Sequence, residues 1–174
     1  MTACGAARGD QIWGAVVHTV ASKVIRAQPR RLMALYLDYV GWPRLYPATV
    51  RGVQLLGEEG GRTRVEVDHV TEGKVLNILT VISANEIRLD EWKPRYEATF
   101  INRFEAHPNG TRYSVFAEVA FKGLTWLLTP IAPPFVRGRL HRHVLRPMKA
   151  RAEGERRGDG PPVPPTRPLE TQPR

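Results

Sequence analysis

The sequence has a single cysteine, Cys4, and no long apolar run. One thiol excludes an internal disulfide framework and a cysteine-rich metal site. No stretch approaches the roughly 18 apolar residues that a membrane-spanning helix needs. The first residues also lack the charged start and long apolar stretch of a secretory signal. These absences predict a cytoplasmic protein.

What the chain does have is enough apolar material for one core. It contains 174 residues, of which 42% are hydrophobic, and this length predicts one domain with extensions. We expect a flexible leader at 1–16, a ligand-binding domain at 17–157 and a disordered tail at 158–174. The tail holds six of the fifteen prolines and almost no large apolar side chains, a composition typical of disorder.

Positive charge gathers at the C-terminal end, where residues 137–174 hold ten of the 26 basic side chains and only four of the 17 acidic ones. Arg139, Arg142, Arg146 and Lys149 follow one another at spacings of three, four and three, which places them on one helix face. This face is either solvated or a membrane-surface site. In the second case it contacts anionic lipid headgroups, at about 1 kcal/mol per basic residue near the surface, and the protein is peripheral to the membrane.

Nucleic acid is disfavoured as a partner of this basic face, because the sequence has no recognition-helix motif and no platform of aromatic side chains for base stacking. Metal is disfavoured too. His141 and His143 stand among clustered arginines, which makes a poor ligand set, so we predict no metal site.

The first half of the chain changes its period once. Residues 18–27 are rich in β-branched side chains and predict a strand. Residues 29–38 predict a short helix that begins at Pro29, and the segment 42–47 has room for only a turn or two more. From Thr49 the period is two, which predicts strands at 49–57, 62–71, 74–83, 86–92, 95–106 and 111–122. The breaks between them are short, so we expect an antiparallel meander of hairpins.

After Gly123 the pattern becomes helical. Leu140, Val144, Leu145 and Met148 form one apolar face, while prolines at four positions should kink or restart the helix. These prolines are Pro130, Pro133, Pro134 and Pro147. A curved antiparallel sheet buries one face only, and this long helix is its natural cover.

Two stretches carry a resemblance to a known family. In "VIRAQPRRLMALYLDYVGWPRLYPATVRGVQLL", a strand ends near Ala27 and Pro29, a helix ends at Asp38, and Trp42 and Pro43 follow. In "NRFEAHPNGTRYSVFAEVAF", an aromatic strand meets a Gly-Thr turn. Over residues 18–153 this order resembles START-like, Bet v 1-like domains of the SRPBCC superfamily. The resemblance implies an α+β helix-grip fold, with a curved antiparallel sheet of about seven strands around a long C-terminal helix and two short helices after the first strand.

The resemblance also implies a function. The family includes polyketide cyclases and aromatases, lipid-transfer proteins, ubiquinone-binding proteins, plant hormone receptors and chaperone activators. It predicts that an internal cavity binds, and by extension transfers, a hydrophobic small molecule such as a lipid, polyketide or isoprenoid, without a cofactor. One alternative is an enzyme of the polyketide cyclase, aromatase or dehydrase type. A second is a membrane- or protein-binding module without a usable cavity.

Strand parity and the family fold together predict the residues that line this cavity. Trp42 and Tyr46 would line its mouth, although both are also expected to fill core space. The other predicted lining residues are Val65, Val67, His69, Leu76, Ile78, Thr80, Ile82, Tyr96, Phe100, Asn102, Phe104, Tyr113, Val115, Ala117, Ile131 and Phe135.

The candidate catalytic residues are His69, Thr80 and Tyr113. The family's aromatase/cyclases use an inward arginine and a nearby hydroxyl on the strand that corresponds to 74–83. Thr80 matches the hydroxyl, but Ile82 stands at the arginine position and supplies no donor for an enolate. This departure weighs against the same chemistry. A lone His69 on a strand is also expected to be a structural residue unless a partner lies within hydrogen-bond reach.

Overall fold

The computed structural model describes residues 16–123 and 129–154. The predicted leader, apart from Val16, and the predicted tail at 158–174 lie outside the described residues. Between them the predicted order of elements is confirmed: a strand, two short helices, six strands and a long helix.

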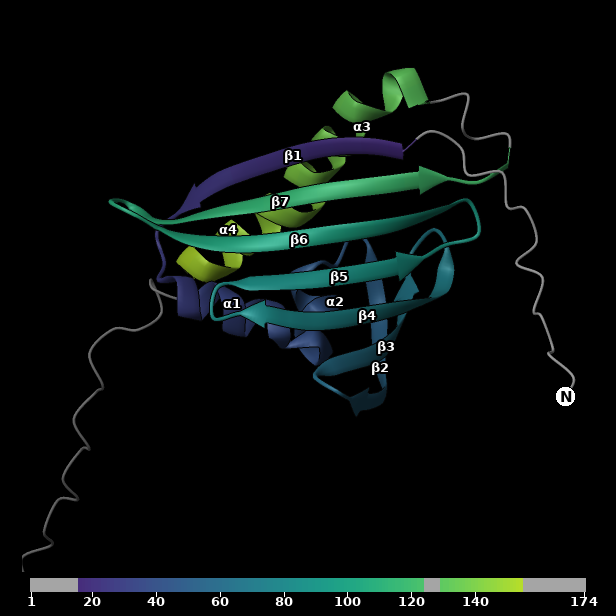
Figure 1. The fold of residues 1–174 in the computed structure, drawn as a ribbon. Helices are drawn as coiled ribbons and strands as arrows, with labels where there is room; N and C mark the ends of the chain where they lie inside the picture. The colour runs from purple at the N-terminus through teal and green to yellow at the C-terminus, as the bar shows by residue number, and fades with distance from the viewer. Residues whose placement is uncertain (1–15, 124–128, 155–174) are drawn as a thin grey trace, which may run out of the picture.

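Seven antiparallel strands form one curved sheet in the order β1-β7-β6-β5-β4-β3-β2. Figure 1 shows how β2 and β3 turn steeply away from the other strands, so that the sheet wraps around the helical segment α3–α4. The strands are β1 (Val16–Ile25), β2 (Val50–Glu59), β3 (Arg62–His69), β4 (Gly73–Ser83), β5 (Glu86–Trp92), β6 (Tyr96–His107) and β7 (Gly110–Phe121).

The β6–β7 hairpin follows from the "PNG" turn. His107 pairs with Gly110, so Pro108 and Asn109 form the tip. Gly110 has a φ of +128°, and a Cβ at this position would lie 2.2 Å from the carbonyl oxygen of Ile25. Only glycine fits both the backbone conformation and this close approach, which fixes β7 beside the end of β1.

After α1 (Pro29–Leu37) the chain continues as the 3₁₀ turn η1 (Tyr39–Gly41) and the short helix α2 (Trp42–Leu45). The Asp38 side chain accepts a hydrogen bond from the Gly41 backbone N–H at 3.1 Å and so caps the turn. The Trp42 indole N–H donates to the Tyr36 carbonyl oxygen at 2.8 Å. This turn therefore holds a buried indole against α1.

The C-terminal helix runs without a break through α3 (Ala132–Leu140), the π-helical turn η3 (His141–Leu145) and α4 (Arg146–Gly154). Two prolines lie in the first turn of α3, where a missing N–H costs nothing. At Pro147 the expected kink is replaced by η3, in which the Arg146 N–H reaches back five residues to the His141 carbonyl oxygen. The wider turn lets the helix pass a proline that lacks an N–H and crowds the preceding turn.

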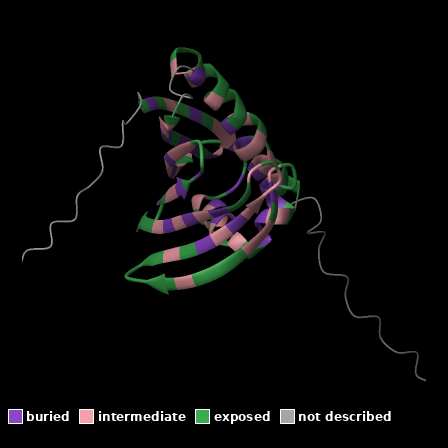
Figure 2. Cartoon of the chain, turned by 90° about the vertical axis from the view of Figure 1, so that its right-hand side faces the viewer, coloured by how far each residue is buried: buried purple, intermediate pink, exposed green. Residues whose placement is uncertain are grey.

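The core lies between the concave face of the sheet and this helix. Leu140, Leu145 and Met148 are buried in it, with Leu32 of α1 and Val65 of β3. Figure 2 shows buried and exposed residues alternating along the strands, as expected for a sheet that buries one face. None of the described helices is long and apolar enough to cross a bilayer.

Candidate ligand-binding site

A cavity of about 830 Å³ lies between the sheet and the C-terminal helix. Its volume falls within the range of roughly 300–1,000 Å³ that is typical of small-molecule sites. It reaches the surface at α3, where Ile131 and Phe135 line it and are 66% and 65% exposed. Its apolar walls comprise Val50, Val67, Leu89, Phe100, Val115, Val119, Phe121, Val136, Leu140 and Val144.

One end of the cavity, here named the aromatic end, is formed by Tyr36, Trp42, Tyr46 and Asn102. The Trp42 ring lies edge-on to Tyr36 at 5.7 Å and to Tyr46 at 6.3 Å, between ring centroids. The Asn102 amide donates to the Tyr36 hydroxyl at 3.0 Å and accepts from the Tyr113 hydroxyl at 2.7 Å. Burial raises the pKa of Tyr36 and Tyr113, so both phenols stay protonated.

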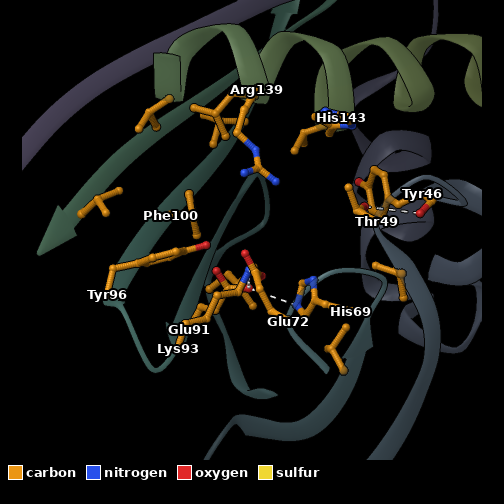
Figure 3. A pocket seen from close by; sticks show the side chains of 18 of the residues that line it. Tyr46, Thr49, His69, Glu72, Glu91, Lys93, Tyr96, Phe100, Arg139 and His143 are labelled. Atoms are coloured by element: carbon orange, nitrogen blue, oxygen red, sulfur yellow. Dashed lines mark hydrogen bonds and ion pairs between the residues drawn. The ribbon is translucent and has the colours of Figure 1, made fainter. Parts of the chain in front are cut away.

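The other end, here named the charged end, is formed by His69, Glu72, Asn77, Glu91 and Lys93. Glu91 pairs with Ala98 and Ile87 with Asn102 on the same ladder, so the two ends lie about 13 Å apart along the sheet. Lys93 Nζ lies 3.2 Å from Glu91 Oε1 and forms a second ion pair with Glu72. Figure 3 shows His69, Glu72, Glu91 and Lys93 grouped on the sheet below the helix.

The ionisation of this cluster is set by its partners. Burial alone would raise the pKa of Glu91, but His69 and Lys93 outweigh it and lower that pKa. Burial likewise disfavours the charge on Lys93, yet Glu91, Tyr96 and Glu72 raise its pKa above the ordinary value. Glu91 and Lys93 are therefore a carboxylate and an ammonium at neutral pH, although they are only 6% and 7% exposed.

Tyr96 closes the charged end at the start of β6. The Lys93 ammonium lies 5.2 Å from the centre of its ring, a cation–π distance. Burial, with the nearby Glu91 charge as the next cause, raises the pKa of Tyr96 to about 12. Its phenol therefore stays neutral beside the ion pair.

Many of the predicted lining residues line the cavity. They are Trp42, Tyr46, Val67, His69, Tyr96, Phe100, Asn102, Val115, Ile131 and Phe135. Trp42 and Tyr46 line the cavity and are also buried in the core. The prediction that they line its mouth is wrong, because the cavity opens beside Ile131 and Phe135. Binding of a ligand by these residues stays a prediction.

The predicted parity of β4 is wrong. Its inward residues are Val75, Asn77 and Leu79, whereas Leu76, Ile78, Thr80 and Ile82 are on the opposite face. The reason is the hairpin register: His69 pairs with Gly73, so the inward Val67 faces Val75 and parity follows across the turn. Thr80 therefore cannot act as a hydroxyl donor in the cavity. Ile82 does not point inward either, so it does not correspond to the inward arginine of the aromatase/cyclases.

Four other predicted residues lie behind the cavity wall rather than on its surface: Val65, Phe104, Tyr113 and Ala117 are buried in the core. The Phe104 and Tyr113 rings stack at 4.7 Å, and the Tyr113 hydroxyl is already used by Asn102. Tyr113 is therefore a packing residue that orients Asn102, and it is poorly placed as an acid for a ligand.

The four basic residues of the C-terminal helix do not share one free face. Arg139 lines the cavity and points into it in Figure 3. Lys149 donates to the Val24 carbonyl oxygen and pairs with Glu153. The π-helical turn between them shifts the helical phase. Arg142 and Arg146 are exposed, as is Arg139 at the cavity, whereas Lys149 is partly buried. Contact of Arg142 and Arg146 with a lipid headgroup stays a prediction.

Sequence reasoning missed most of the charged end, namely Glu72, Asn77, Glu91 and Lys93. It named Arg139 only as a membrane-surface residue and not as a lining residue. For Glu91 a signal exists, because Ile87, Leu89 and Glu91 alternate along β5 and the first two are apolar. A carboxylate that continues an inward apolar row is typical of a functional group or of a buried pair. Glu72 gives no such signal, since it lies in a turn.

No family model matches the sequence, and no curated protein sequence matches it significantly. Solved structures do resemble it. The Zhui aromatase/cyclase from Streptomyces sp. R1128 aligns with 14% identity and a TM-score of 0.68, over 84% of this chain and 99% of that one. A START superfamily protein from Mycobacterium smegmatis aligns with 16% identity and a TM-score of 0.59, over 82% of this chain and 99% of that one.

A third likeness is to the di-domain ARO/CYC StfQ from the steffimycin biosynthetic pathway, with 17% identity and a TM-score of 0.66. It covers 82% of this chain and 52% of that one, so the chain spans about half of the di-domain protein. Identities this low establish the fold alone. The sheet order, the helix pair after β1 and these likenesses agree: the chain has the α+β helix-grip fold of START-like, Bet v 1-like (SRPBCC) proteins.

Proposed function

We propose that this protein binds, and by extension transfers, a hydrophobic small molecule such as a lipid, polyketide or isoprenoid. The observation that carries the proposal is the cavity of about 830 Å³ with apolar walls and a few polar groups at its ends. Removing apolar ligand surface from water contributes about 25 cal/mol per Å² before the costs of association. Fold relatives described as aromatase/cyclases and START proteins agree with this proposal by analogy.

The test is native mass spectrometry of gently purified protein, followed by extraction and identification of what leaves with it. We expect a hydrophobic molecule at near-stoichiometric amount, or uptake of one from an added lipid and polyketide mixture. A matched variant, Phe100→Asp, places a carboxylate on the apolar wall and should abolish uptake. If neither the parent nor the variant takes up any apolar compound, the proposal is wrong.

An enzyme of the polyketide cyclase or dehydrase type is the second candidate, and one observation favours it. His69 lies in the cavity with its Nε2 3.2 Å from the Glu91 carboxylate, and an imidazole beside a carboxylate is a common arrangement in general-base sites. Incubation with a reactive poly-β-ketone and analysis of the products tests this. Product formed by the parent and lost in His69→Gln, with ligand uptake retained, would assign an enzyme.

A further inference from the structure

Three side chains from three neighbouring strands converge inside the charged end. Asn77 of β4 pairs directly with Glu91 of β5, and both face the cavity. His69, at the end of β3, brings its Nε2 to 3.2 Å from Glu91 Oε1. All three are held by the backbone of the sheet, so their positions are fixed by strand register rather than by a loop.

Two of these side chains have hydrogen-bonding capacity that the protein leaves unused. Asn77 is 2% exposed, and its Oδ1 is buried without a partner among the described residues. His69 Nε2 is close to Glu91, but the two are not aligned as a hydrogen bond, and this nitrogen is also buried without a partner there. An unsatisfied buried polar group destabilises the protein. A ligand group that fills this capacity removes that destabilisation.

The charges around these atoms decide which ligand group fits. Glu91 is ionised and already neutralised by Lys93, which also pairs with Glu72. A ligand carboxylate would bring a third negative charge beside Glu91 and Glu72, which share the single Lys93 cation, and it cannot donate to the unpaired Asn77 Oδ1. A ligand ammonium would have to compete with Lys93, whose Nζ lies 3.2 Å from Glu91.

An uncharged hydroxyl has no such conflict, because it carries one donor and two acceptor lone pairs. It donates to Asn77 Oδ1 or to Glu91 and accepts from an N–H of His69 or from the amide of Asn77. This match holds for either orientation of the amide and either tautomer of the imidazole.

We infer that the charged end is a hydroxyl-binding subsite built by His69, Asn77 and Glu91, and that the ligand is an uncharged hydrophobe with an alcohol or phenol at one end. The inference rests on the proposed function, because the body of the ligand must lie along the apolar walls. Leu89 and Phe100, which pair with each other, form the part of the apolar wall between the subsite and the aromatic end.

The first experiment uses the unmodified protein and four ligands that share a twelve-carbon chain: 1-dodecanol, dodecyl methyl ether, dodecanoate and dodecylamine. Each displaces the neutral fluorescent probe N-phenyl-1-naphthylamine at pH 7. We expect dodecanol to bind about tenfold or more tightly than the other three, which is the effect of one well-made hydrogen bond in a buried site.

The second experiment removes the subsite. Asn77→Leu keeps the side-chain size and deletes the amide, so dodecanol should lose its advantage over the ether, while the affinity of the ether stays unchanged. Because the substitution removes an unsatisfied polar atom, the thermal stability of the ligand-free protein should stay the same or rise. Thr80→Val, on the outer face of the same strand, is the matched control and should keep the preference for dodecanol.

The outcomes separate this inference from the proposed function. If the probe binds and all four ligands displace it equally, the cavity binds hydrophobes without a hydroxyl subsite, and the inference is wrong while the proposed function stands. A preference for dodecanoate would also overturn it and would assign the polar contact to Arg139. If neither the probe nor any ligand binds, both proposals fail.

Discussion

The two ends of the cavity treat their polar atoms in opposite ways. At the aromatic end, Tyr36, Asn102 and Tyr113 satisfy one another, and Trp42 donates to a backbone carbonyl. The Tyr46 hydroxyl is the exception at this end, because it is buried without a hydrogen-bond partner among the described residues. At the charged end, an ion pair is buried, while Asn77 and His69 each keep one atom that has no hydrogen-bond partner in the part of the chain that the structure describes. A self-satisfied network stabilises the fold, whereas unused capacity inside a cavity is typical of a site that awaits a ligand.

The largest expected effect comes from a substitution at the aromatic end. Trp42→Ala removes a buried indole and its hydrogen bond, and it should lower the free energy of unfolding by about 3–5 kcal/mol. Urea unfolding followed by circular dichroism measures this loss. The control is Trp92→Ala, at a position 40% exposed, where we expect about 1 kcal/mol or less. Equal losses would show that Trp42 does not anchor this end.

The next largest effect is expected from a substitution at the charged end. Lys93→Met leaves Glu91 and Glu72 without their shared cation and should destabilise the fold by about 3 kcal/mol, as expected when one partner of a buried ion pair is removed. Lys74→Met is the matched control, because Lys74 forms an exposed pair with Glu66 on the same sheet, and it should change stability very little. The same urea unfolding measurement compares the two. A small effect at Lys93 would mean that water solvates the cluster.

A smaller effect tests the network at the aromatic end. Tyr113→Phe keeps the ring that stacks on Phe104 and removes only the hydroxyl that donates to Asn102. The buried acceptor is then unsatisfied, so we expect a loss of about 1–2 kcal/mol in urea unfolding. Tyr39→Phe, at a half-buried position, should lie within about 0.5 kcal/mol of the parent. If Tyr113→Phe is as stable as the parent, Asn102 is oriented by other contacts.

The charged end should also make stability depend on pH. The pKa of Glu91 is lowered in the folded protein from an ordinary value of 4.5. Its ionised form therefore stabilises the fold above pH 4.5, and this contribution is lost as the pH falls through the lower folded value. The stability difference between the parent and Glu91→Gln should narrow from pH 6 to pH 3. A difference that stays constant over this range would contradict the assigned pKa direction.

The smallest expected effect checks the corrected parity of β4. Thr80 lies on the outer face of the sheet, so Thr80→Val should leave displacement of the fluorescent probe by dodecanol unchanged within about twofold. Leu79→Ala, at the buried neighbouring position, removes core volume and should lower stability by about 2–5 kcal/mol. A loss of ligand affinity in Thr80→Val would mean that Thr80 points into the cavity, as the sequence pattern predicted.

Sequence reasoning reached the fold because the signals were local. The "PNG" turn fixed one hairpin, the period of two marked the strands, and the spacing of Leu140, Leu145 and Met148 identified the buried face of the helix. Where alternation is clear, as along β7, parity was also predictable. In β4 it was not, since apolar side chains occupy both faces at Leu76, Ile78 and Leu79 and hide the period.

By itself the sequence determined the order of elements, the antiparallel meander and the place of Trp42 and Tyr46 after the first short helix, because turns, caps and hydrophobic periods are set by neighbouring residues. Only the tertiary structure decided the charged end. Its groups come from β3, from a turn, from β4 and from the end of β5, and strand register brings them together. The direction of Arg139 likewise depends on how the helix packs over the sheet. Contacts between residues distant in sequence leave no local period to read.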